Sequence, residues 1–199
     1  GTHHHALDGP MATKLKSVGK VVGHVDARIV DEEDNFLAPG ETGEIVTRGP
    51  HVMKGYLNSP EMTAQAMRGG WFHTGDSGYF DEDGFLFLTG RIKDMIISGG
   101  ENIYPIEIEN VLSLHPAVSE NAIIGLPDEH WGEAVHAVIT LVAGASVAEQ
   151  EIIDWCRESL AHYKCPRAVT IRTEPMPLSS VNKIMKSELR KAYLAENKI

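Results

Sequence analysis

The feature that most constrains how this 199-residue chain can fold is a change of pattern near residues 91–94. Before it, from about Ser17, short stretches alternate apolar and polar residues and are separated by turn residues, as in half-buried strands. After it, from Met95 onward, helical and strand-like stretches follow one another. The sequence therefore predicts two compact parts, each long enough to bury a core of its own.

The first part is expected to be a small, mostly antiparallel β module, residues 1–92. Strands are predicted over residues 25–31, 43–49 and 85–88, and a short helix over residues 59–66.

The second part, residues 93–199, is expected to place helices on a short sheet, which makes the fold class α+β. Pro105 opens a helix, because proline is favoured at the first helical position. Ser146 and Glu149 have the spacing of a capping box ahead of an apolar stripe. Strands are predicted over residues 122–125, 134–142 and 168–172, and a last helix over residues 186–196.

The formal net charge is −10, from 18 basic and 28 acidic side chains. Non-specific binding to nucleic acid or to anionic membranes rewards basic surfaces, so the composition argues against both partners. No apolar run approaches the roughly 20 residues of a membrane-spanning helix, so no transmembrane segment is expected. The first residues do not resemble a signal peptide, and we expect a cytoplasmic protein.

The two cysteines, Cys156 and Cys165, form no CxxC pair and no Cys/His metal spacing. We interpret them as reduced, structural thiols and expect no metal site. The triplet His3, His4 and His5 is interpreted as native sequence rather than as a tag remnant, and nothing nearby would order it around a metal ion.

Three segments carry side chains suited to chemistry. Asp76 ends a Thr-Gly-Asp turn, where a carboxylate can accept two hydrogen bonds from a vicinal diol such as ribose, although turn-capping aspartates are common. Gly99 and Gly100 permit positive φ, which suits either a tight turn or close approach of a ligand. Lys183 precedes a helix; beside a phosphate it would stabilise negative charge, whereas most such lysines are simply solvated.

In order along the chain come His73-Thr-Gly-Asp76, then Gly90-Arg-Ile-Lys-Asp94 running into Gly99-Gly-Glu-Asn-Ile-Tyr-Pro105, and finally Lys183. This series resembles the last motifs of acyl-CoA synthetases, which are adenylate-forming, AMP-binding enzymes similar to luciferases and peptide-synthetase adenylation domains. The resemblance covers nearly the whole chain from about Ser17.

The resemblance implies a ligase reaction in two steps. A carboxylic acid, expected to be a fatty acid, attacks the α-phosphate of ATP held with Mg²⁺ and forms an acyl-adenylate. The thiol of coenzyme A then displaces AMP. Carried over by motif, Asp76 and Arg91 would bind the nucleotide sugar, and Lys183 would be the catalytic lysine of adenylation.

The resemblance also assigns a hinge and a thiol path. Lys93 falls on the hinge about which the small carboxy-terminal domain rotates between the two half-reactions. After rotation, the loop of Ser98, Gly99, Gly100 and Glu101 would replace Lys183 at the active site and line the tunnel for coenzyme A.

One position departs from the family pattern, because Asn182 stands where glycine usually precedes the catalytic lysine. Asn tolerates the left-handed conformation better than most residues, so we expect the turn to be kept. Lys186 is the nearest rival for the catalytic role. Lys183 is also considered as a site of regulatory acylation, which would remove its charge.

The family's phosphate loop, its Tyr-Gly-x-Thr-Glu segment and its acyl pocket are not found in these 199 residues. We therefore expect a fragment that is inactive alone: residues 1–92 as the end of the large AMP-binding domain, and residues 93–199 as the mobile carboxy-terminal domain. Its main partner would be the missing amino-terminal part of the same polypeptide. The alternatives are a domain that loads a carrier protein, or a non-catalytic module of the same fold.

Overall fold

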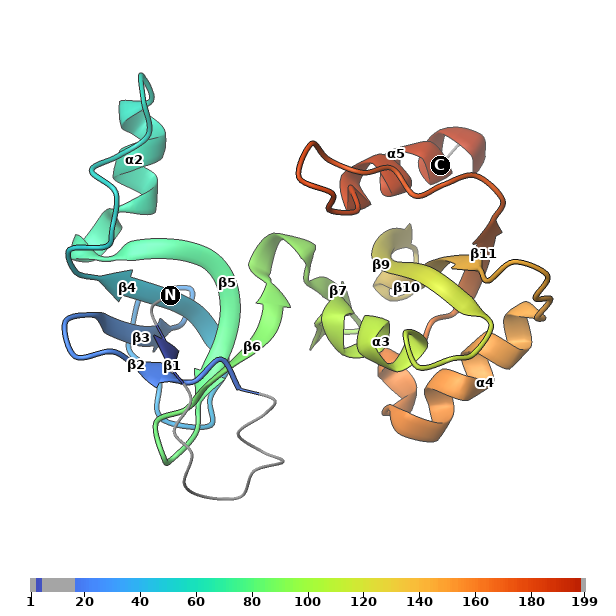
Figure 1. Ribbon diagram of the computed structural model, residues 1–199, viewed down its shortest axis with the longest axis horizontal. Helices are drawn as coiled ribbons and strands as arrows, with labels where there is room; N and C mark the ends of the chain where they lie inside the picture. The colour runs from blue at the N-terminus through green and yellow to red at the C-terminus, as the bar shows by residue number, and fades with distance from the viewer. Residues whose placement is uncertain (1–2, 5–16, 198–199) are drawn as a thin grey trace. The chain divides into compact units, whose positions relative to one another are not determined.

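The computed structural model describes residues 3–4 and 17–197, and the chain divides into two compact units, Gly1–Lys93 and Asp94–Ile199 (Figure 1). The division falls after Lys93, one residue beyond the boundary expected at residue 92. It lies within a short 3₁₀ helix, η2 (Ile92–Asp94). Of the histidine triplet, His3–His4 form strand β1, and His5 lies outside the described residues.

The first unit is built on a four-stranded antiparallel sheet in the order β3-β4-β5-β6. Its strands are β3 (Asp26–Val30), β4 (Gly43–Arg48), β5 (Phe72–Phe80) and β6 (Leu86–Arg91). Strand β2 (Lys20–Val21) pairs with β1, and helix α2 (Pro60–Ala66) is followed by η1 (Arg68–Gly70). The expected antiparallel module is confirmed, but β5 was not predicted as a strand, because its Thr-Gly-Asp segment has the composition of a turn.

The core of the first unit follows from the alternation along its strands. Ala27 and Ile29 of β3 are buried while Arg28 between them is exposed, as period-two patterning requires. Ile29, Ile45 and Leu86, from three different strands, form one apolar cluster. Helix α2 contributes no buried residue.

The second unit contains a five-stranded sheet with β10 (Gly132–Leu141) at its centre. Strand β10 pairs antiparallel with β9 (Val118–Asp128) and parallel with β11 (Ala168–Arg172), and its first residue also pairs with Ser98. Ser98 ends β7 (Ile96–Ser98), which forms a hairpin with β8 (Glu101–Ile103). The helices are α3 (Pro105–Leu112), α4 (Glu149–Ser159), η3 (His162–Lys164) and α5 (Lys186–Asn197).

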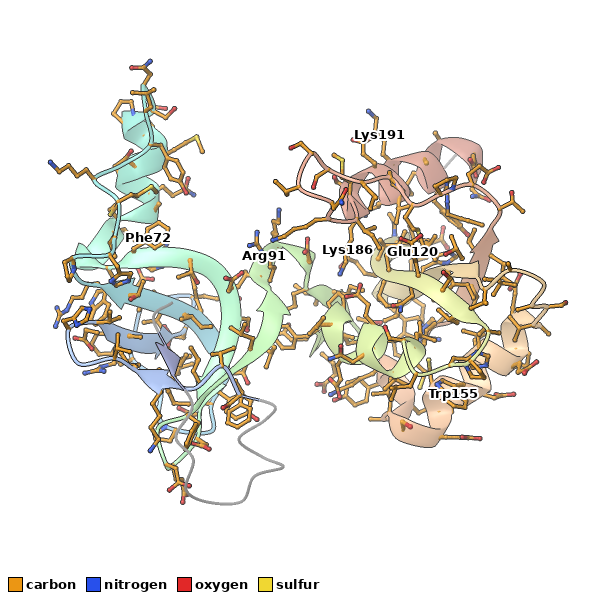
Figure 2. The ribbon with its side chains drawn as sticks, in the orientation of Figure 1. Phe72, Arg91, Glu120, Trp155, Lys186 and Lys191 are labelled. Atoms are coloured by element: carbon orange, nitrogen blue, oxygen red, sulfur yellow. The ribbon has the colours of Figure 1, made fainter. Side chains whose placement is uncertain are left out.

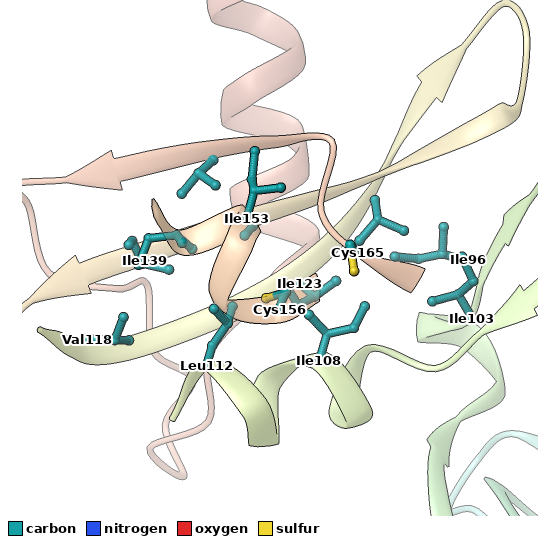
Figure 3. Packing of buried hydrophobic residues seen from close by; sticks show 14 residues of the cluster. Ile96, Ile103, Ile108, Leu112, Val118, Ile123, Ile139, Ile153, Cys156 and Cys165 are labelled. Atoms are coloured by element: carbon teal, nitrogen blue, oxygen red, sulfur yellow. The ribbon is translucent and has the colours of Figure 1, made fainter. Parts of the chain in front are cut away.

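Both faces of this sheet are covered, which explains the nearly continuous apolar runs in β9 and β10. One face packs on α3 and α4 through residues such as Ile123 and Ile139 of the sheet and Ile153 of α4 (Figure 3). The other face packs on α5 through Ala122, Ile124 and Val138 together with Leu189 (Figure 1). The predicted α+β class, with helices on a short sheet, is confirmed.

The expected capping box is wrong. Helix α4 begins at Glu149 with Ala148 at its N-cap, and no side chain caps it. Ser146 therefore lies before the cap position, out of reach of the first-turn amides that a capping side chain bonds. Glu149 and Glu151 still place negative charge in the first turn, where it favours the helix dipole.

The two cysteines are free and buried in the core beside α4. Burial raises the pKa of the Cys156 thiol to about 12, with a smaller contribution from Cys165. Burial likewise raises the pKa of Cys165. Both groups are therefore protonated at neutral pH, as the interpretation as structural thiols requires. Within residues 3–4 and 17–197, no helix has the length and apolar character needed to span a bilayer.

His136 makes the second unit sensitive to acid. Burial lowers the pKa of this histidine to about 4 from its ordinary 6.5, and its Nε2 lies 2.8 Å from the hydroxyl of Thr170. The unfolded chain takes up this proton below about pH 6.5, whereas the folded chain does so only near pH 4. The neutral side chain therefore contributes stability that is full above pH 6.5 and is lost as the pH falls towards 4.

We predict that the free energy of unfolding falls between pH 7 and pH 4 by about 3 kcal/mol more in the wild type than in His136→Gln. Urea unfolding at the two pH values measures this difference. The control is His162→Gln, which removes an exposed histidine of the same unit and should keep the wild-type pH dependence. Equal pH dependence in the wild type and His136→Gln would contradict the prediction.

Candidate functional site

Asp76 lies where the pairing of β4 and β5 is irregular. Glu44 of β4 pairs with Ser77 of β5, and Val46 of β4 pairs with His73 of β5. The two pairs are two residues apart on β4 but four residues apart on β5. Strand β5 therefore carries two extra residues in this interval, one more than in an ordinary β-bulge. Gly75 has φ +71° at this bulge, and no atom lies within 4 Å of an added Cβ, so the glycine is needed for its backbone conformation and not for space.

The bulge brings Asp76 opposite Arg91, at the end of β6 (Figure 2). Arg91 Nε lies 3.1 Å from Asp76 Oδ1, and the two side chains are 50% and 36% exposed. A pair this exposed contributes little to stability. Its second carboxylate oxygen and the remaining guanidinium donors stay accessible for a ligand with hydroxyl groups.

Side chains from β4 and β5 hold the bulge. Thr74 Oγ1 donates to the carbonyl of Ile45 at 2.7 Å and accepts the amide of Asp76 at 3.1 Å. The carboxylate of Glu44 accepts the amide of Gly75 at 3.0 Å. Glu44 is not among the residues predicted from sequence, because a glutamate in an alternating strand looks like an ordinary solvent-facing residue.

Asp76 and Thr74 also line a pocket of about 500 Å³ in the first unit. Most of the lining is apolar, including Phe72, Met53 and Leu88, and Thr47 and His51 add polar atoms. A mainly apolar pocket with a few polar groups is the usual form of a small-molecule site.

Ser98, Gly99, Gly100 and Glu101 form the hairpin turn between β7 and β8. Gly99 and Gly100 have φ values of +62° and +85°, as a two-residue turn of this kind requires. The amide of Gly99 donates to the carbonyl of Trp131 at 2.9 Å, and a Cβ on Gly99 would come within 2.8 Å of the Trp131 ring. The first glycine is thus required by φ and by packing, and the second by φ alone.

Lys183 lies on a tight turn ahead of α5. Asn182 has φ +57°, so the expectation that asparagine supports this turn in place of glycine is confirmed. The amide of Ser179 donates to the carbonyl of Lys183 at 2.8 Å, and the amide of Lys183 donates back to Ser179 Oγ at 3.2 Å. In the part of the chain that the structure describes, the ammonium of Lys183 has no hydrogen-bonding or ionic partner.

Lys186, the rival candidate, is engaged elsewhere. Its Nζ lies 2.6 Å from Glu109 Oε1, and the side chains are only 23% and 15% exposed. Glu109 belongs to α3, and the same oxygen accepts the amide of Ile123 in β9. The ion pair and this hydrogen bond link the first turn of α5, which carries Lys186 (Figure 2), to α3 and to β9. This arrangement gives Lys186 a structural role and leaves Lys183 as the lysine open to a ligand.

Comparison with known sequences identifies the family. The sequence model of the AMP-binding enzyme family matches residues 1–57, and that of the AMP-binding enzyme C-terminal domain matches residues 107–183. A feruloyl-CoA synthase from Amycolatopsis sp is 44% identical over 183 residues, and a 2-succinylbenzoate–CoA ligase from Geobacillus kaustophilus (strain HTA426) is 47% identical over 179 residues. The chain belongs to the AMP-binding, adenylate-forming enzymes.

These AMP-binding relatives are longer proteins. The two alignments cover 92% and 90% of this chain but only 37% and 36% of the relatives. Neither name refers to a fatty acid, so the expected fatty acid substrate receives no support from them.

Solved structures of AMP-binding enzymes share the fold. ATP-bound MatB from Rhodopseudomonas palustris matches with a TM-score of 0.82 and 38% identity, over 89% of this chain and 36% of that one. An o-succinylbenzoate CoA synthetase from Bacillus subtilis, in complex with the acyl-adenylate OSB-AMP, matches with 0.84 and 40%, over 90% and 36%. An amide bond synthetase from Marinactinospora thermotolerans matches with 0.82 and 38%, over 90% and 37%.

The different environments of the two lysines lead to a stability prediction. Lys186→Ala leaves the partly buried carboxylate of Glu109 without its cation, so we expect the free energy of unfolding of the second unit to fall by about 1–3 kcal/mol. Lys183→Ala is the matched control and should change it by less than about 0.5 kcal/mol. Urea unfolding followed by backbone amide signals of the second unit measures both variants. A larger loss for Lys183→Ala than for Lys186→Ala would overturn the assignment.

Proposed function

We propose that this chain is part of an ATP-dependent acid–thiol ligase that forms an acyl-adenylate and transfers the acyl group to coenzyme A. The observation that carries the proposal is the combination of an exposed Asp76–Arg91 pair with Lys183, which is exposed on an ordered turn and whose ammonium has no partner among the described residues. The relatives named as CoA ligases and the structures named with bound ATP and acyl-adenylate support it.

In the first half-reaction, a carboxylate oxygen attacks the α-phosphorus of Mg-ATP. A bond forms between that oxygen and phosphorus, the bond to the bridging oxygen breaks, and pyrophosphate leaves. Asp76 accepts hydrogen bonds from the ribose hydroxyls, and Arg91 donates to the sugar beside it. The ammonium of Lys183 stabilises the negative charge shared by the attacking carboxylate and the phosphoryl oxygens.

The magnesium ion arrives with ATP as part of the substrate. Among residues 17–197, no group of three or more His, Cys, Asp or Glu side chains is arranged to hold a metal ion. In the proposed mechanism the side chains of this chain act on the sugar and on the α-phosphate.

In the second half-reaction, the thiol sulfur attacks the carbonyl carbon of the acyl-adenylate. The C–S bond forms, the C–O bond to the phosphate breaks, and AMP leaves while the thiol proton passes to solvent or to a base. We propose that the turn of Ser98, Gly99, Gly100 and Glu101 lines the path of the thiol, and that rotation about Lys93 exchanges this turn for Lys183. Lys93 is exposed and is the last residue of the first unit, as a hinge between two compact bodies should be.

The acid and the acceptor are proposed from the names of the relatives. Feruloyl and 2-succinylbenzoyl groups are aromatic, which favours an aromatic carboxylic acid over the fatty acid expected from sequence. The match to an amide bond synthetase favours an amine as the alternative acceptor, alongside a carrier-protein thiol. The fold does not discriminate between acceptors, because all three kinds of enzyme need the same adenylation site.

We predict that the isolated 199-residue chain releases no AMP above background from Mg-ATP, coenzyme A and a panel of aromatic and fatty acids. The physical reason is that Asp76, Arg91 and Lys183 contact the sugar and one phosphate and leave the acid and the β- and γ-phosphates without a site. Acid-dependent AMP release by the isolated chain would show a complete active site and would refute this part of the proposal.

In the intact ligase that contains this chain, Lys183→Ala should slow adenylate formation by about 100-fold or more, because one preorganised charge at the transition state is worth that much. The transfer of a preformed acyl-adenylate to coenzyme A should change little. Lys191→Ala, which removes an exposed lysine of α5, is the control and should leave both half-reactions unchanged. Equal slowing of both half-reactions by Lys183→Ala would contradict the assigned role.

A further inference from the structure

The bulge that presents Asp76 has a backbone whose hydrogen bonds the sheet does not satisfy. Because β5 advances four residues while β4 advances two, Thr74 and Gly75 have no ladder partners on β4. The backbone groups freed in this way need other partners, which side chains or water can supply. The Thr74 hydroxyl and the Glu44 carboxylate supply partners for the amides of Asp76 and Gly75.

The carboxylate of Glu44 bonds several groups at and beside the bulge. Its Oε1 accepts the amide of Gly75 at 3.0 Å, and its Oε2 lies 2.8 Å from Nδ1 of His73 and 3.2 Å from Nη2 of Arg68. An ionised carboxylate only accepts hydrogen bonds, so Nδ1 of His73 is the donor in this pair. The Glu44 side chain is 13% exposed and the His73 side chain 5%, so these bonds are shielded from water.

The position of these bonds separates Glu44 from an ordinary stabilising residue. Within β5, the Glu44 carboxylate bonds the side chain of His73 and the backbone amide of Gly75, which lie on either side of Thr74. Gly75 has φ +71°, and no atom lies within 4 Å of a Cβ added to it. The hydrogen bond from its amide to Glu44, together with the hydrogen bonds of the Thr74 hydroxyl, holds the chain where it enters Asp76.

We propose that Glu44 is a positioning residue for the nucleotide, which acts by holding the bulge of β5 so that Asp76 faces the ribose hydroxyls. The inference rests on the proposed role of Asp76 in ligand binding. Glu44 itself does not contact the ligand. A glutamine at this position is a poorer support, because it has one acceptor oxygen in place of two: if that oxygen accepts from Gly75, the NH2 group faces the Arg68 guanidinium, which is also a donor.

The first experiment uses the 199-residue chain and does not depend on its activity. In ¹H–¹⁵N spectra, Glu44→Gln should shift the amide signals of Gly75 and Asp76 strongly and leave those of the second unit in place. Glu41→Gln is the matched control, since Glu41 also binds a backbone amide, that of Ala38 at 2.7 Å, in a turn away from the bulge. Unchanged Gly75 and Asp76 signals in a folded Glu44→Gln chain would overturn the inference.

The second experiment uses the intact ligase in a double-mutant cycle. Glu44→Gln should raise the KM for ATP by about 10- to 100-fold, the effect of losing a hydrogen bond to a charged group, and leave the KM for coenzyme A unchanged. In the Asp76→Ala background the same change should alter the KM for ATP by less than about two-fold, because its effect passes through Asp76. Glu41→Gln should match the wild type throughout.

The outcomes distinguish the inference from the proposed function. If Asp76→Ala leaves the KM for ATP unchanged, the proposed role of Asp76 fails and the inference fails with it. Suppose that Asp76→Ala raises the KM for ATP. If Glu44→Gln then leaves the KM for ATP unchanged, or raises it by the same factor with and without Asp76→Ala, only the inference fails. If Glu44→Gln does not fold, Thr74→Val removes the other support of the same bulge and should produce the same selective rise in the KM for ATP.

Discussion

The mismatch between β4 and β5 is the constraint on which the candidate nucleotide site depends. A regular ladder would alternate the side chains of β5 between the two faces of the sheet and would bond every backbone group across the strand. Two extra residues interrupt that alternation at Gly75 and bring Asp76 beside Arg91. Strand β5 is thus unpaired with β4 over the bulge, as a loop would be, while the residues on either side keep their ladder pairs. That combination suits a ligand-binding carboxylate, since precision comes from the sheet and accessibility from the bulge.

In the second unit, too, the residues that support the fold differ from the residues that could contact a ligand. Strand β10 is buried on both faces and carries neither the Ser98–Glu101 turn nor Lys183. It supports them through neighbouring elements. Its first residue, Gly132, pairs with Ser98 at the base of the glycine hairpin, and its partner strand β9 is linked through Glu109 to Lys186 on α5. The candidate groups lie one element away from the core, where a backbone turn is free to adopt positive φ.

Elements that depend on a local residue pattern could be predicted from the sequence, whereas features that depend on how strands pair could not. The central strands and the helices beginning at Pro105 and Lys186 were predictable, because their apolar periodicity and proline signal are local. Strand β5 was not, since its glycines and Thr-Gly-Asp run resemble a turn until the bulge is seen. Ser146 failed as a cap because nothing local reveals that the helix starts three residues later, at Glu149. Asp76 and Lys183 stood out by their chemistry, and motif resemblance assigned roles to them and to Arg91, whereas no sequence signal connected Glu44 with a residue 31 positions away.

The contrast between Lys183 and Lys186 shows why burial decides what a charge can do. Both precede or open α5, three positions apart, and composition does not separate them. Lys186 lies against a carboxylate shielded from water, where the partnership is strong and leaves nothing for a ligand. At Lys183 the turn satisfies its own backbone: Asn182 and Ser179 close it with main-chain and hydroxyl bonds, so no side-chain cation is needed to hold it. The ammonium is left solvated on a fixed base. The role proposed for Lys183 requires this arrangement, because a structural partner would compete with the phosphate for the ammonium at every turnover.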